Sequence, residues 1–136
     1  MQKFWDSLAD DVSLSPPCFV RCIRVIAELR DGLIDCAGNA AMIAQINEVI
    51  DIDLIKQMAQ QDIFDWEYFQ RLVSSAVGVI RRIQDQARGE DLTSKWNELR
   101  ITMEGASTGW SRIFSQALEF MLSRVSIIRI DLANNR

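Results

Sequence analysis

Histidine is absent from this chain of 136 residues, and its absence removes several kinds of functional site. No imidazole is available to complete the common zinc-ligand sets. No run of residues has the spacing of a nucleophile with its base, of a glycine-rich phosphate loop or of a metal cage. The sequence therefore predicts a protein that is not an enzyme and that needs no cofactor or metal.

Long apolar runs are missing as well. No stretch approaches the about 20 apolar residues that span a bilayer. The N-terminus reaches Asp6 almost at once and lacks the apolar segment of a secretory signal. We expect a soluble, cytoplasmic protein with no transmembrane segment.

The three cysteines are an odd number in a chain long enough to bury a core without disulfides. Cys18, Cys22 and Cys36 are interpreted as buried thiols in a reducing compartment. Cys18 and Cys22 stand four residues apart, but a metal shared between them would lack a histidine to complete a common zinc set. We therefore expect free cysteines.

The net charge of −4 is distributed unevenly along the chain. Residues 1–65 carry five basic and eleven acidic side chains (−6), whereas residues 66–136 carry ten basic and eight acidic ones (+2), so the two parts attract each other. The acidic balance excludes nucleic acid as the main partner, because binding to phosphates requires lysine and arginine. Arg81, Arg82 and Arg88 form the one compact basic patch, which is interpreted as a solvated helix face and as a secondary candidate for protein binding.

Apolar residues recur at steps of three and four along nearly the whole chain, which is the period of amphipathic helices. The pattern predicts an all-α fold, a bundle of about six helices in a single domain of residues 1–136. The expected helices cover about 4–12, 16–37, 39–50 with a further turn or two to 58, 65–88, 91–104, and a long last helix after Gly109.

Helix ends are predicted from capping residues. Ser15 followed by Pro16 suits the start of the second helix, and Gly38 suits a left-handed cap at its end. Asp51 or Asp53 is expected to cap the turns up to residue 58, and Asp65 the next long helix.

The last helix has the most regular pattern, and it carries a second apolar row beside the first. The first row, at steps of four, three, four, three and four, consists of Phe114, Leu118, Met121, Val125, Ile128 and Leu132. So wide an apolar surface belongs at the centre of a bundle. Either this helix packs centrally within the chain, or its remaining partner lies beyond the end of the sequence. In the second case part of the helix is expected to be exposed or to form a homodimer.

Four aromatic residues lie within six positions: Phe64, Trp66, Tyr68 and Phe69. They form either a core plug or an exposed ridge that binds a protein, because aromatic anchors dominate interface energetics. We take this cluster as the first candidate for a protein-binding site.

Four segments, in order, carry a family signature. They are Phe4–Leu8 with Pro16-Pro17, Glu48–Gln57, Ile63–Tyr68, and Ala117–Leu122 leading to Arg124–Asn134. Together they resemble the T-complex protein 11 family, and in particular the N-terminal part of a family domain that looks longer than this chain.

The resemblance implies a regulatory role rather than chemistry. Animal members of the family are associated with sperm function, and the yeast member with suppression of defects in cyclic-AMP-dependent protein kinase. The leading hypothesis is thus a non-enzymatic interaction module that regulates cyclic-AMP and protein kinase A signalling through protein partners. The alternatives are a structural assembly protein without a signalling role, and an enzyme that uses carboxylates such as Glu48, Asp51 and Asp53.

Overall fold

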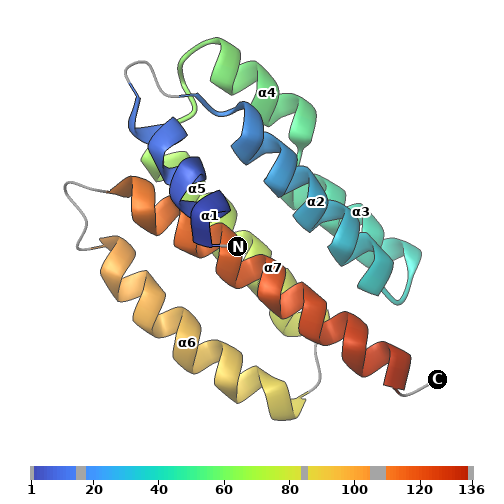
Figure 1. Ribbon diagram of the computed structural model, residues 1–136. Coiled ribbons are helices and arrows are strands. Elements are labelled where there is room, and N and C mark those ends of the chain that lie inside the picture. The colour runs from blue at the N-terminus through green and yellow to red at the C-terminus, as the bar shows by residue number, and fades with distance from the viewer. Residues whose placement is uncertain (1, 15–17, 84–85, 105–109, 135–136) are drawn as a thin grey trace.

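A computed structural model describes residues 2–14, 18–83, 86–104 and 110–134. Within these ranges the chain forms seven α-helices and no strand, which confirms the all-α bundle (Figure 1). The turns expected after Asp51 form a separate short helix, α4. The helices are α1 (Gln2–Ser13), α2 (Val20–Cys36), α3 (Ala40–Val49), α4 (Ile52–Gln60), α5 (Trp66–Ile83), α6 (Gln86–Glu104) and α7 (Trp110–Asn134).

Helix α7 lies at the centre and packs against α1, α2, α5 and α6 (Figure 1). Most of its predicted apolar stripe is buried, namely Phe114, Leu118, Met121, Val125 and Ile128, whereas Leu132 is partly exposed. Ala117 of the second row is buried too, while Phe120 is half-buried. Of the two arrangements foreseen for this helix, central packing within the chain is therefore confirmed, and a homodimer stays a prediction.

A buried hydrogen bond joins the first helix to the last. Trp5, Leu8 and Val12 of α1 are buried in the core. There the Ser115 hydroxyl donates to the backbone carbonyl of Trp5 at 2.7 Å. Because Ser115 is itself buried, this bond satisfies a polar group that would otherwise be costly inside the core.

Helices α2 and α7 approach each other closely at Gly32. A Cβ atom at this position would lie 2.8 Å from Cγ1 of Val125 and 3.2 Å from Nη2 of Arg129. Arg129 also forms an ion pair with Asp35 of α2 at 2.9 Å. The attraction expected between the acidic and basic parts of the chain is thus present as a contact between these two helices.

Three helix starts are capped by side chains that accept backbone N–H bonds. Asn39 caps α3, Asp51 caps α4 by accepting from Leu54 at 3.1 Å, and Asp65 caps α5 by accepting from Tyr68 at 2.8 Å. These satisfy amides that have no partner within the helix. The predicted caps at Asp51 and Asp65 are confirmed.

The predicted start of α2 is wrong, and so is the left-handed cap predicted at its end, although the helix does end close to Ala37 as expected. The helix begins at Val20 rather than at Pro16, and Ser15 and Pro16 lie outside the described residues. The Cys18 amide donates to the carbonyl of Asp11 in α1, so the approach to α2 is bonded to α1 and is not yet helical. At the other end Ala37 is extended and Gly38 does not adopt the left-handed backbone expected of it.

The left-handed conformation occurs instead after α4. Asp62 has φ of 59°, its amide donates to Ala59, and the Ile63 amide donates to Met58 at 2.9 Å. This pair of backbone hydrogen bonds is the Schellman motif that ends many helices. It turns the chain sharply toward Phe64 and the start of α5.

The predicted boundary between the helix expected at 65–88 and the one expected at 91–104 is also wrong. Helix α5 ends at Ile83, and Arg88 and Gly89 lie inside α6 rather than at the end of α5. Glycine inside a helix costs about 1 kcal/mol relative to alanine but does not have to end it. Arg88 therefore belongs to a different helix from Arg81 and Arg82.

Within the described ranges, no helix combines the length and the apolar character that a membrane span needs.

The close approach at Gly32 predicts opposite effects for two glycine-to-alanine substitutions. Both gain helix propensity, but Gly78→Ala in α5 adds a methyl group to open space, whereas Gly32→Ala adds one against the branched Val125 side chain. We expect Gly32→Ala to be less stable than Gly78→Ala by about 1–3 kcal/mol, the cost of overpacking. Urea unfolding of both variants measures the difference, and equal stabilities would contradict the close packing of α2 on α7.

A candidate protein-binding groove

Two of the four aromatic residues predicted as a binding ridge lie in the core. Phe69 stacks on Phe114 of α7 with 3.7 Å between ring centroids, and Phe64 packs edge-on against Phe19 at 4.8 Å. Both Phe64 and Phe69 are buried. They thus form the plug that was the other interpretation of this cluster.

Trp66 and Tyr68 are half-buried at the start of α5 and pack against the core from outside. Tyr68 also lines a cavity of about 470 Å³ between α3 and α5, together with Glu48 and Arg71. Burial raises the pKa of the Tyr68 hydroxyl, and the nearby Asp51 carboxylate raises it further. The part of the cluster available to a partner is therefore small and mixed in polarity.

The predicted basic patch lies apart from the aromatic residues. Arg81 and Arg82 are exposed in the last turn of α5, roughly 20 Å along the helix from Trp66 at 1.5 Å per residue. Arg88 belongs to α6, and its side chain lies outside the described residues. The structure therefore does not bring the seven predicted residues together into one site.

The carboxylates considered for catalysis have other positions. Asp51 is engaged as the cap of α4, Asp53 is exposed in the first turn of that helix, and Glu48 lines the cavity between α3 and α5. Within the ranges described, no group of three or more Cys, Asp or Glu side chains is placed to hold a metal ion.

A groove of about 700 Å³ lies between α2 and α4. Apolar side chains from the start and outer side of α2 form one wall, and two residues of α4 contribute to the other. These apolar residues are Phe19, Val20, Ile23, Ala27, Ile52 and Ala59. Val20 is 61% exposed, so the groove is open to solvent beside it.

The groove arises because α2 carries more apolar residues than the core can cover. Its buried stripe, which includes Cys22, Ile26 and Leu29, faces the other helices of the bundle. Beside that stripe, Val20, Ile23 and Ala27 form a second row at steps of three and four. Because α4 has only nine residues, it covers this second row incompletely.

Sequence reasoning missed this site, although a signal for it exists. The second row on α2 was readable, but nothing in the sequence placed α4 beside it. A second apolar row on a helix predicts either a further packing neighbour or an open groove, and only the tertiary structure distinguishes the two.

Two cations line the groove. Arg24 comes from α2 and Lys56 from α4, and both are exposed. Neither has an ion-pair partner among the residues that the structure describes. The groove thus combines an apolar surface with two uncompensated positive charges.

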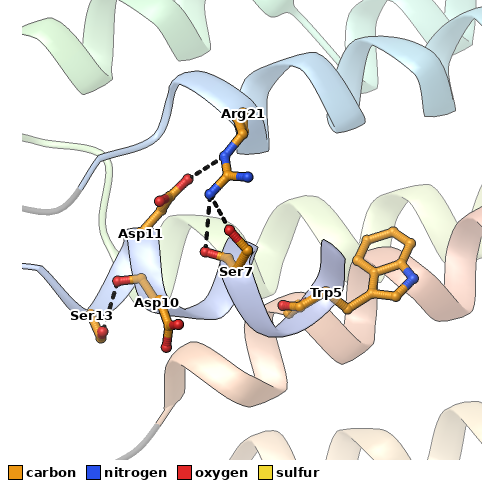
Figure 2. Close-up of polar contacts among 7 residues, drawn as sticks. Trp5, Ser7, Asp10, Asp11, Ser13 and Arg21 are labelled. Atoms are coloured by element: carbon orange, nitrogen blue, oxygen red, sulfur yellow. Dashed lines mark hydrogen bonds and ion pairs between the residues drawn. The ribbon is translucent and has the colours of Figure 1, made fainter. Parts of the chain in front are cut away.

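The side chain of Arg21 joins the start of α2, which supplies one wall, to α1 (Figure 2). The Arg21 guanidinium donates to the Asp11 carboxylate at 2.7 Å and, from its Nη2 atom, to the carbonyl and the hydroxyl of Ser7. This cation lies beside the C-terminal half of α1, where the helix dipole favours positive charge. The bond to Arg21 lowers the pKa of Asp11, and the same bond raises that of Arg21.

The family model described as T-complex protein 11 matches residues 1–81, more than half of the chain. This range contains the signature segments up to Tyr68, whereas the segments from Ala117 onward lie outside it. No solved structure matches the chain.

The Arg21 contacts predict a pH dependence. Because the folded pKa of Asp11 lies below its ordinary value of 3.8, the ion pair stabilises the fold fully above that pH and loses its contribution as the pH falls through the lowered pKa. Asp11→Asn is therefore expected to melt at a lower temperature than the wild type at pH 7 but at nearly the same temperature below the folded pKa. Thermal melts across pH 2–7 test this window, with Asp10→Asn as the control, since Asp10 forms no ion pair among the described residues. A difference that persists unchanged at the acid end would contradict the prediction.

The cysteines differ in accessibility, contrary to the expectation that all three are buried. Cys18 is exposed at the groove, whereas Cys22 and Cys36 are buried. Burial, with smaller contributions from the Asp11 and Cys18 charges, raises the pKa of the Cys22 thiol to about 12. Iodoacetamide should therefore alkylate Cys18 in the folded protein while Cys22 reacts only after unfolding, because the thiolate is the nucleophile. Peptide mass spectrometry measures both rates, and equal rates in the folded protein would contradict the structure.

Proposed function

We propose that this chain, which belongs to the T-complex protein 11 family, is a helical module that binds a protein in the α2–α4 groove and performs no chemistry. The observation that carries the proposal is the open apolar groove of about 700 Å³ between α2 and α4. Apolar clefts of this size with a few placed polar groups are typical binding sites. An exposed apolar surface of a folded domain indicates an interaction site.

The proposal that no chemistry takes place rests on how the candidate carboxylates are used. Asp51 accepts a backbone N–H bond as a helix cap, and Asp53 is exposed. A carboxylate that acts as a general acid or base needs an environment that raises its pKa. Asp51 and Asp53 are both exposed, so neither stands in the apolar surroundings that such a group needs.

The partner is proposed to belong to a signalling pathway. The family resemblance implies regulation of cyclic-AMP and protein kinase A signalling, and the partner is proposed to act there, in the cytoplasm. The subunits of cyclic-AMP-dependent protein kinase are accordingly the first purified proteins to titrate against the chain.

A photo-crosslinking amino acid at Val20 tests whether the groove is the binding site. Ile101 in α6 is the matched comparison position, because it is 66% exposed and lies outside the groove, while Val20 is 61% exposed. Crosslinking in intact cells, followed by mass spectrometry, identifies the protein that each position captures. We expect position 20 to capture a specific protein that position 101 does not.

The identified protein is then titrated, in purified form, against the wild type, Val20→Asp and Ile101→Asp. An aspartate at Val20 stands in the first turn of α2, where the helix dipole favours an anion, so the fold is expected to be retained. Its charge in the apolar groove should weaken binding about tenfold or more, whereas Ile101→Asp should leave the dissociation constant within about twofold. Equal affinities of Val20→Asp and the wild type would show that the groove is not the binding site.

A further inference from the structure

The cations of the α2–α4 groove define the chemistry of what it holds. Arg24 and Lys56 are the charged side chains among the residues that line it, and each comes from a different helix. They stand in the part of the sequence that is most acidic, since residues 1–65 carry a net charge of −6. The groove thus carries two positive charges although it is built from the acidic part of the sequence.

The charged neighbours on the same helices do not neutralise this site. Glu28 follows Arg24 by one turn of α2, and Asp53 precedes Lys56 by one turn of α4, but neither lines the groove. Glu28 and Asp53 form no ion pair with Arg24 or Lys56 among the described residues. An incoming anion therefore meets two available cations.

The apolar part of the groove has the form that suits a helix. Val20, Ile23 and Ala27 present apolar side chains along α2 at the spacing of successive turns, with Ile52 and Ala59 on the facing helix. An amphipathic helix binds such a groove through residues at its own three- and four-residue steps. The groove is open beside Val20, so it does not enclose a ligand on all sides as an acyl chain would require.

We propose that the groove binds an acidic amphipathic helix of a protein partner, whose apolar face packs on Val20, Ile23 and Ala27 while its carboxylates pair with Arg24 and Lys56. This inference rests on the proposed function and specifies the partner's chemistry. Charge complementarity of this kind sets specificity and orientation, and the apolar contact supplies most of the affinity.

The experiment uses two designed peptides of about 16 residues, long enough for roughly four helical turns. Both carry leucines at three- and four-residue steps, flanked by glutamates in one peptide and by lysines in the other. Fluorescence anisotropy measures their binding to the wild type and to two charge-reversal variants, Arg24→Glu with Lys56→Glu and Lys3→Glu with Arg100→Glu. The second variant changes the net charge equally at exposed residues outside the groove.

We expect the acidic peptide to bind the wild type and to bind more weakly as salt rises, because exposed ion pairs are screened. The groove variant should bind it about tenfold more weakly, since two favourable pairs become repulsive, while the control variant stays within about twofold. The groove variant should also bind the basic peptide more tightly than the wild type does. Circular dichroism verifies that both variants are folded.

Equal binding of the two peptides to the wild type, or equal losses in both variants, would overturn the proposal. Dodecanoate and anionic lipid vesicles form further arms, and binding of either in place of the acidic peptide would assign the groove to an amphiphile instead. The proposed function is tested separately, by the crosslink at Val20. That crosslink can identify a partner that inserts a neutral or basic segment into the groove. That result would retain the binding site and reject its acidic occupant.

Discussion

The burial of α7 against α1, α2, α5 and α6 is the constraint on which the rest of the structure depends. Its 25 residues present apolar side chains over more than one face, so each neighbour has to supply an apolar stripe of its own. A polar group on such a helix requires a partner inside the core, which the carbonyl of Trp5 provides for Ser115. Helix α2 comes so close to α7 at position 32 that no side chain fits between them, which explains the glycine there.

The sequence allowed the helices and most of the core to be predicted, because both follow from local periodicity. Caps such as Asp51 and Asp65 were predictable for the same reason, since each bonds an amide three residues away. The start of α2 was not, because it depends on a bond from Cys18 to Asp11 in another helix. Glycine was a poor guide as well, since Gly89 lies within α6 and the left-handed turn belongs to Asp62.

The candidate site was less predictable than the fold. A dense aromatic cluster has the same sequence pattern whether it forms a core or a surface, and its outcome was decided by Phe19 and Phe114, which come from distant parts of the chain. The groove requires α4 to lie beside the second apolar row of α2, a tertiary fact with no local signature. Periodicity specifies how many faces of a helix are apolar, but not which of them remain uncovered.

The walls of the groove are held by contacts that are largely separate from the core. The cap at Asp51 and the turn at Asp62 fix the two ends of α4, and the contacts of Arg21 fix the start of α2 (Figure 2). These contacts lie at or near the surface, whereas stability comes mainly from the apolar cluster around α7. A surface of this kind tolerates changes in its side chains without loss of the fold.

The bond between Trp5 and Ser115 joins residues 110 positions apart, and this separation has a consequence for biosynthesis. During translation α1 and α2 leave the ribosome long before α7, at a time when the surface that covers them has not been made. The parts of these two helices that α7 covers therefore lack that cover until α7 has been synthesised. The native arrangement of the first helix can form only at that late stage, so this bundle completes its folding after α7 emerges rather than progressively from its N-terminus.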